Sequence, residues 1–150
     1  MKLSTKTRYA TRAMLDLALN SGEDVVSARE LAARQGISGK YLEQLLASLR
    51  AAGLMRTVRG AHGGHSLARH PSEINLREIY DVFEGTEGLV ECTTSPELCE
   101  RSNTCVTTEV WADMYSACMD MLESTTLEEL VGRARNKQGD SQADRIAGLQ

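Results

Sequence analysis

The sequence predicts a mainly α-helical fold with one β-hairpin, and two observations predict it. Helix-capping sequences recur, each followed by apolar residues at the 3.6-residue helical period. By contrast, a single pair of short extended runs flanks a glycine-rich turn, which is the pattern of a hairpin. A chain of 150 residues is long enough for one globular domain with an appendage.

The first predicted helix begins after Ser4, because the hydroxyl of Ser4 can accept a hydrogen bond from a free backbone N–H of the first turn. The apolar residues that follow recur at the helical period, and the polar segment 20–22, which ends in glycine, terminates the helix. The apolar face consists of Tyr9, Ala10, Ala13, Met14, Leu17 and Ala18.

The next two predicted helices lie close together in the chain. Ser27 and Glu30 form a capping box at the start of one, and Gly36 suits the left-handed turn that ends it. Ser38 caps the following helix almost at once. Two capped helices joined by a tight glycine turn are typical of a helix-turn-helix motif. The buried stripe of the second of these helices consists of Leu42, Leu45, Leu46 and Leu49.

The opposite face of that helix is predicted to bind DNA, because its short polar side chains are free to touch base edges in a major groove. The role of Glu43 stays open: it can accept a hydrogen bond from a cytosine amino group, or it can repel the DNA backbone and exclude wrong sequences. The candidate contacts on this helix are Ser38, Lys40, Tyr41, Glu43 and Gln44.

The hairpin is predicted from extended runs at 54–59 and 65–69. A hairpin after a helix-turn-helix is a wing, and Arg59 at its tip would lie near phosphates or in a narrow minor groove. His62 and His65 form a poor metal pair, because two ligands on a turn have no third ligand nearby. The candidate wing contacts are Arg59, Gly60, His62, Gly63 and Gly64.

A fourth helix is predicted directly after the hairpin. Asn75 and Glu78 repeat the capping box, and Ile74 can pack against Ile79 across the first helical turn. This helix would complete a winged helix-turn-helix domain at residues 1–84.

The two halves of the chain carry opposite charge. Residues 1–70 contain eleven basic and five acidic residues and have a net charge of +6, whereas residues 71–150 have a net charge of −10. The first half suits a polyanion, and the second would be repelled by one. An even spread of charge over a solvated surface is the alternative, which the helix-turn-helix and wing patterns disfavour.

Three cysteines occupy a polar stretch without helical period: Cys92, Cys99 and Cys105, with six and five residues between them. Structural zinc sites draw on a pair of ligands separated by roughly two to four residues, and disulfides are disfavoured in a reducing cytosol. Thiolates at wider spacing suit an iron–sulfur cluster. Zinc, bare redox-active thiols and inert cysteines remain alternatives.

The helical period returns from Val106 onward, and Cys118 is expected to be a small buried apolar residue on the resulting stripe. Little else in the chain could cover this stripe, so we expect a partner helix from a second copy; packing on the chain's own head is the alternative. A short capped helix follows at 124–130, and a disordered tail is expected at 135–150. The stripe consists of Val110, Trp111, Met114, Ala117, Cys118, Met121 and Leu122.

Several classes of protein are disfavoured. No stretch approaches the ~18 apolar residues of a membrane helix, and the polar start of the chain does not resemble a secretory signal. There is no Ser/His/Asp arrangement, no phosphate-binding Gly-Lys loop and no paired carboxylates in a glycine-rich setting. We therefore expect a soluble cytoplasmic protein that is not an enzyme.

Taken together, these motifs resemble the IscR-type family of winged-helix iron–sulfur transcriptional regulators, which includes NsrR and RirA. The likeness covers roughly residues 1–132 and is densest at 1–17, 34–45 and 58–64, with the motifs MKLS, RQGIS, YLEQL and VRG followed by GG. The resemblance implies a homodimer formed through a long dimerisation helix, here residues 106–122. It also implies an iron–sulfur cluster held by Cys92, Cys99 and Cys105.

The chain departs from that family at one position. Thr108 stands where an IscR-like protein carries a histidine as fourth cluster ligand, shortly beyond the last cysteine. The fourth ligand could be Glu109, water, a small thiol or a group of the partner subunit, and both 2Fe–2S and 4Fe–4S clusters stay open.

The fold class expected from the sequence is therefore mainly α, with a winged helix-turn-helix DNA-binding domain and a long C-terminal dimerisation helix. The predicted parts are the DNA-binding domain (1–84), the cysteine-bearing loop (85–105), the dimerisation helix with a short packing helix (106–134) and the tail (135–150). We expect a homodimer that binds a roughly palindromic double-stranded DNA operator under control of the cluster. A zinc-stabilised or cofactor-free repressor and a cluster carrier are the alternatives.

Overall fold

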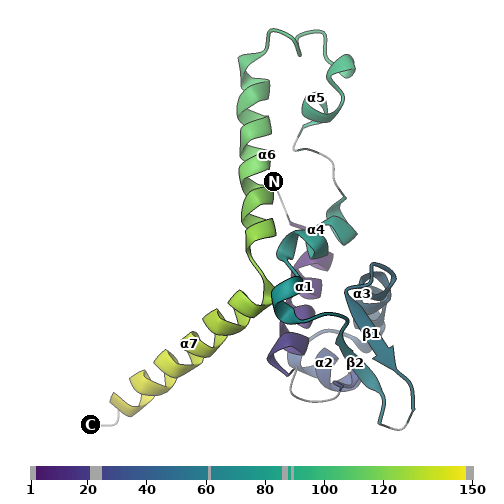
Figure 1. Ribbon diagram of the computed structural model, residues 1–150, viewed down its shortest axis with the longest axis vertical. Helices are drawn as coiled ribbons and strands as arrows, with labels where there is room; N and C mark the ends of the chain where they lie inside the picture. Colours follow the sequence, from purple (N-terminus) through teal and green to yellow (C-terminus); the bar gives the residue numbers. More distant parts are fainter. Residues whose placement is uncertain (1–2, 21–24, 61, 86–87, 89, 148–150) are drawn as a thin grey trace.

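A computed structural model describes residues 3–20, 25–60, 62–85, 88 and 90–147. A helical head lies at one end of the long helix α6, and a second long helix, α7, leaves the head at the same junction (Figure 1). The helices are α1 (Thr5–Leu19), α2 (Ala28–Gln35), α3 (Gly39–Ala51), α4 (Leu76–Glu84), α5 (Glu91–Thr94), α6 (Val106–Ser124) and α7 (Leu127–Ala147). The strands are β1 (Met55–Val58) and β2 (Gly64–Leu67), and the 3₁₀ turns are η1 (Pro71–Glu73) and η2 (Pro96–Leu98).

The predicted helix caps are confirmed. The Ser4 hydroxyl accepts a hydrogen bond from the backbone N–H of Thr7 at 3.2 Å. Both predicted capping boxes are formed, at the starts of α2 and α4. Gly36 has a φ of 65°, the left-handed conformation that ends α2 and lets α3 begin three residues later.

One core holds the head together. The apolar faces of α1 to α4 meet the inner side of the hairpin and the first turns of α7, whose Leu127 is completely buried. The largest fully buried side chains are Met14, Leu31, Leu42, Leu45, Leu49, Leu54, Ile74, Ile79 and Leu127. The core therefore fixes both the helix-turn-helix and the start of α7.

The hairpin is also confirmed, and its strand β2 ties it to the segment before α2. Strands β1 and β2 are antiparallel, with Met55 opposite Leu67 and Val58 opposite Gly64. Val26, just before α2, exchanges two backbone hydrogen bonds with His65 of β2, at 2.8 and 2.9 Å. The wing is thus joined to the segment that precedes the helix-turn-helix by backbone hydrogen bonds.

The end of α4 is tied to the start of α1. The Glu84 carboxylate accepts hydrogen bonds from the backbone N–H of Ser4 at 2.9 Å and from the hydroxyl of Thr7. These bonds, with those from Ser4 contributing most, lower the pKa of Glu84 from its ordinary value because they favour the charged carboxylate. The segment that leads to the cysteines therefore starts from a fixed point on the head.

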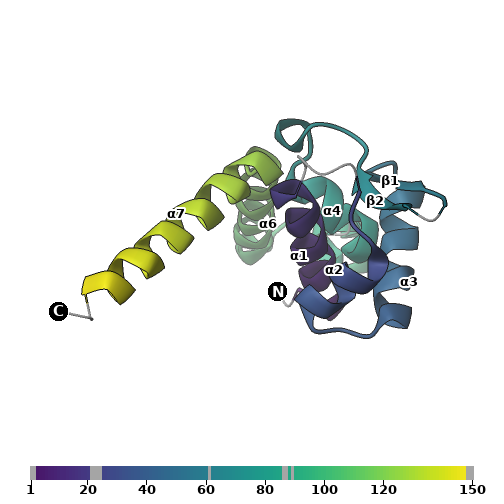
Figure 2. The ribbon, with the colours of Figure 1, turned by 90° about the horizontal axis from the view of Figure 1, so that it is seen from below.

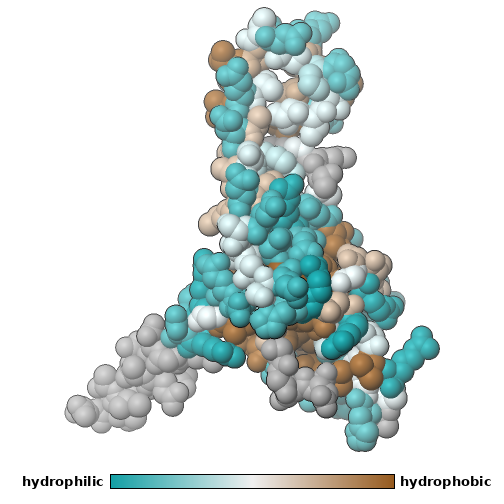
Figure 3. Space-filling model, in the orientation of Figure 1, coloured by the Kyte–Doolittle hydropathy of each residue, from teal (hydrophilic) through white to brown (hydrophobic). Residues whose placement is uncertain are grey.

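Helix α6 is confirmed, but the face that it turns toward the head differs from the predicted stripe. Met119, which lies outside the stripe, is the buried residue of α6, whereas Val110 is 57% exposed and Met121 is 68% exposed. Apolar and polar surfaces alternate along the free edge of α6 (Figure 3). Cys118 is half-buried rather than buried as predicted, because it lies at the border between the two faces.

Residues 135–147 of the expected tail belong to a helix in the structure. Helix α7 extends to Ala147 and projects away from the head (Figure 2), well beyond the predicted end at 130. Burial of Leu127 and Val131 fixes its first turns, and the Ala, Arg, Lys and Gln residues that follow favour helix without an intervening proline.

The cysteine stretch contains short helical elements that its sequence does not predict, namely α5 and η2. Among the described residues, none of the helices is both long and apolar enough to span a membrane.

Candidate nucleic-acid interface and cysteine site

Helix α3 presents the predicted contact residues at the surface of the head. Ser38 caps the helix by accepting a hydrogen bond from the backbone N–H of Tyr41 at 3.2 Å. The four leucines of the predicted stripe are buried, so the opposite face is turned to solvent. Ser38, Lys40, Glu43 and Gln44 are exposed, and Tyr41 is half-buried.

Tyr41 is held in place by a partner that the sequence pattern did not identify. Its ring meets the ring of Tyr9 edge-on, with 6.1 Å between the ring centroids. The Arg12 guanidinium lies 5.3 Å from the centroid of Tyr9. Tyr9 was expected on the core face of the first helix, but it is half-buried and packs against the ring of Tyr41. The sequence signal that could have indicated this contact is the position of Tyr9 at the edge of the apolar face of the first helix.

A buried carboxylate positions the turn that precedes α3. Asp16 of α1 forms an ion pair with Arg34 at 2.9 Å and accepts a hydrogen bond from the Gln35 side chain at 2.8 Å. Asn20 also donates to Asp16, at 3.0 Å. Because these contacts hold the end of α2 against α1, they fix the direction in which α3 leaves Gly36.

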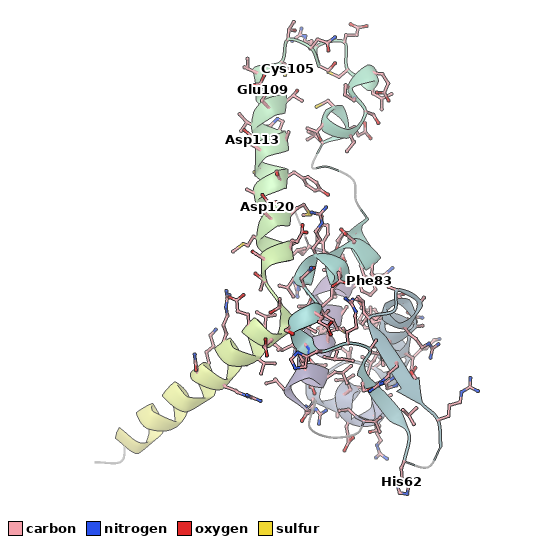
Figure 4. All side chains as sticks on the ribbon, in the orientation of Figure 1. His62, Phe83, Cys105, Glu109, Asp113 and Asp120 are labelled. Atoms are coloured by element: carbon pink, nitrogen blue, oxygen red, sulfur yellow. The ribbon has the colours of Figure 1, made fainter. Side chains whose placement is uncertain are left out.

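The tip of the wing exposes three of the predicted contacts. Arg59, Gly60 and His62 are exposed, and His62 projects from the tip, away from the head (Figure 4). Gly60 has a φ of 120°, a backbone conformation that favours glycine. The position of Arg59 beside this turn suits contact with a polyanion.

Gly63 and Gly64 lie where backbone segments of the wing come very close together. A Cβ atom at Gly63 would collide with the backbone oxygen of Val58, and one at Gly64 would lie 2.6 Å from the backbone oxygen of Val26. Gly64 is buried and Gly63 is half-buried. These glycines allow close approach of backbone segments, so they shape the wing, and Gly64 is not available to touch DNA directly.

His65 is buried, whereas His62 is exposed at the tip of the wing. Its ring is buried and its Nδ1 lies 3.1 Å from the hydroxyl of Thr57. Burial is the main cause that lowers the pKa of His65, and the charge of Glu43 opposes this effect. Among the described residues, no group of three or more His, Cys, Asp or Glu side chains is arranged to hold a single metal ion.

Two of the three predicted cluster ligands lie together at the start of α6. Cys92 and Cys105 line an open hollow of about 440 Å³, which Thr108 and Glu109 also line. The sulfur of Cys92 lies 3.9 Å from the Thr108 hydroxyl. Cys99, at the end of η2, is half-buried and does not belong to the lining.

The environment of Cys105 favours its thiolate. Cys105 is the residue from which α6 starts, and its sulfur lies 3.1 Å from the hydroxyl of Thr107. Hydrogen bonds from Thr107, then from Thr108, lower the pKa of Cys105 to about 7. A thiolate is the form of cysteine that binds metals.

The donor set fits an iron–sulfur cluster better than a single ion. Three free thiols are available, which are the usual ligands of such clusters. The hollow that Cys92 and Cys105 line is open and about 440 Å³ in volume, and a multi-iron core occupies more space than one zinc ion does. The residues present are therefore compatible with a cluster.

Comparison with known proteins identifies the family. The family model described as "Rrf2: Iron-dependent Transcriptional regulator" matches residues 3–133. The chain belongs to the Rrf2 family. This agrees with the expected IscR-type resemblance, because the HTH-type transcriptional regulator IscR of Pectobacterium atrosepticum is 39% identical over 145 residues, which are 97% of this chain and 86% of that protein.

Solved structures agree with the Rrf2 assignment and with the predicted winged-helix fold. The structure of T. potens IscR matches with a TM-score of 0.76 and 40% identity, covering 92% of this chain and 91% of that one. CymR, the global cysteine regulator of B. subtilis, matches with a TM-score of 0.77 and 38% identity over 89% of this chain and 98% of that one. The named relatives are regulators, so this Rrf2 protein is a DNA-binding transcriptional regulator and not an enzyme.

The close packing at Gly64 can be tested by mutation. Gly64→Ala should destabilise the head by about 1–3 kcal/mol, because the added methyl group cannot fit beside Val26. Gly39→Ala, where the Cβ position is open, is the matched control and should leave stability nearly unchanged. Urea unfolding followed by circular dichroism measures both, and equal stability of the two variants would contradict the close packing at Gly64.

Proposed function

We propose that this Rrf2 protein is a homodimer whose binding to promoter DNA is controlled by an iron–sulfur cluster held by Cys92, Cys99 and Cys105. The observation that carries the proposal is that Cys92 and Cys105 share a hollow at the start of α6, the helix whose outer face is apolar and exposed. The candidate cluster site, through Cys105, and the candidate dimer surface thus meet on the same helix.

The proposed DNA contacts are the exposed start of α3 and the tip of the wing. Ser38, Lys40 and Gln44 would reach base edges, with Tyr41 positioned by Tyr9, and Arg59 would contact phosphates or a narrow minor groove. Residues 1–70 carry a net charge of +6, which favours binding to a polyanion with marked salt dependence. Two heads related by a two-fold axis would bind a roughly palindromic operator.

The proposed dimer surface is the outer face of α6. Five apolar side chains on this helix are at least 40% exposed, which is an unusual amount of apolar surface for a single soluble helix to leave in water. A second copy of the same face would bury it in a self-complementary contact. The five residues are Val106, Val110, Trp111, Met114 and Met121.

A continuous chain of contacts supports coupling between the cysteines and the head. Cys105 starts α6, Met119 buries the middle of α6 against the head, and Arg77 of α4 forms an ion pair with Glu123 at 3.1 Å. Ordering of the cysteine stretch around a cluster would bias how α6, and with it each head, is placed in the dimer. Because linkage is reciprocal, DNA would bias the cysteine site equally.

The bound group would supply redox and ligand-exchange chemistry that side chains lack. The proposal covers both 2Fe–2S and 4Fe–4S clusters, since three thiolates suit either. The role of the residues of this chain is to hold the thiolates at the start of α6 and to expose one side of the site to solvent.

Arg59→Ala should weaken DNA binding about tenfold and should lower the slope of log affinity against log salt by about one unit per lost phosphate contact. Arg101→Ala, which removes the same charge from an exposed position on the cysteine stretch, should change neither quantity. Fluorescence anisotropy with an operator fragment at several salt concentrations measures both. Unchanged affinity and slope for Arg59→Ala would show that the wing does not contact DNA.

Cys99→Ala should abolish the visible absorbance of protein purified without oxygen, together with its iron and acid-labile sulfide, because one thiolate ligand is lost. Cys118→Ala should keep all three, because Cys118 lies on the body of α6. Full colour in the Cys99 variant would exclude Cys99 as a ligand. Zinc as the only metal of the wild-type protein would favour a zinc-stabilised repressor.

Val110→Glu should raise the dissociation constant of the dimer by roughly thirtyfold or more, because it would place a carboxylate in a buried apolar contact. Ser116→Glu, exposed on α6 but outside its apolar face, is the control and should leave the dimer intact. Light scattering across a dilution series gives the constant. A Val110→Glu protein that dimerises as the wild type does would contradict the proposed surface.

A further inference from the structure

The proposed function leaves one ligand of the cluster unassigned. Iron–sulfur clusters are usually held by four protein ligands, and this chain offers three cysteines in the stretch before α6, while Cys118 lies more than three turns along that helix. The inference that follows rests on the proposed cluster and concerns the residue that completes its ligand set.

Within the described residues, the lining of the hollow at the start of α6 offers few side chains that could serve as the fourth cluster ligand. Apart from Cys92 and Cys105, Glu109 is the residue of its lining whose side chain is an established metal ligand. The remaining side chains of the lining are hydroxyls, an amide and apolar groups.

The position of Glu109 on α6 suits a ligand. It follows Cys105 by four residues and lies in the first turn of α6, and both residues line the same hollow. Figure 4 places both at the far end of α6. Ion pairs among the described residues leave Glu109 unused, and its carboxylate is exposed at the rim of the hollow.

We infer that the Glu109 carboxylate is the fourth ligand of the cluster, alongside the thiolates of Cys92, Cys99 and Cys105. Ligation joins one carboxylate oxygen to one iron and changes no oxidation state. An oxygen donor binds iron less firmly than a thiolate does at a soft sulfide-rich core. The iron at Glu109 is therefore the one most readily released or exchanged.

The test compares Glu109→Gln, Glu109→Cys and wild-type protein, each reconstituted with iron and sulfide without oxygen. Glu109→Gln should show a changed electron paramagnetic resonance spectrum after reduction, and it should lose iron to a chelator roughly tenfold faster. Glu109→Cys should keep the cluster and shift its visible absorbance, because a thiolate replaces the oxygen donor. Glu100→Gln, an exposed carboxylate outside the hollow, is the matched control and should behave as the wild type.

The outcomes distinguish a failure of the Glu109 inference from a failure of the proposed cluster. Glu109→Gln and Glu109→Cys proteins with the spectrum and iron release of the wild type would overturn the inference and assign the fourth position to water, a small thiol or a group of the partner subunit. The proposed cluster would survive that result. Wild-type protein without iron and sulfide would instead overturn the proposed function itself.

Discussion

The arrangement of the whole molecule depends on a small backbone contact between the head and the α6–α7 junction. The N–H of Leu76 donates to the oxygen of Thr125, and the N–H of Leu127 donates to the oxygen of Ile74, both at 2.9 Å. Leu127 then enters the core without any exposed surface. These two bonds lie at the start of α4, so they fix where both long helices leave the head.

That contact has an energetic basis as well as a geometric one. Buried backbone groups that lose their partners are costly, and Leu127 would leave a cavity if it withdrew from the core. The head and the base of α6 therefore move as one unit, whereas the far end of α6 and the cysteine stretch contact the head much less (Figure 1). The candidate sensing site therefore lies at the free end of α6, whereas the other end of α6 is anchored to the head.

The sequence predicted those features that depend on local chemistry. Caps at Ser4, Ser27 and Asn75, the left-handed Gly36 and the leucine stripe of α3 follow from hydrogen bonding and periodicity within a few residues, and each is present. The same reasoning predicted that α3 and the wing form a surface for DNA, which stays a prediction. It also identified the cysteine stretch, but not its short helical turns.

Other features depend on contacts between distant segments and could not be deduced locally. The burial of Gly64 depends on the backbone of Val26, some forty residues earlier in the chain. The half-buried state of Tyr9 depends on Tyr41. The helical continuation of α7 depends on the anchoring of its first turn, which the polar composition of the following residues does not reveal.

The join between Val26 and His65 has a consequence for how such regulators diversify. Because main-chain atoms alone make this bridge, side chains at the tip of the hairpin can be replaced without altering the separation between hairpin and α3. The proposed wing contacts could thus be exchanged while the spacing between the hairpin and the helix-turn-helix is kept. The backbone geometry stays constant while the side chains at the hairpin tip are free to change.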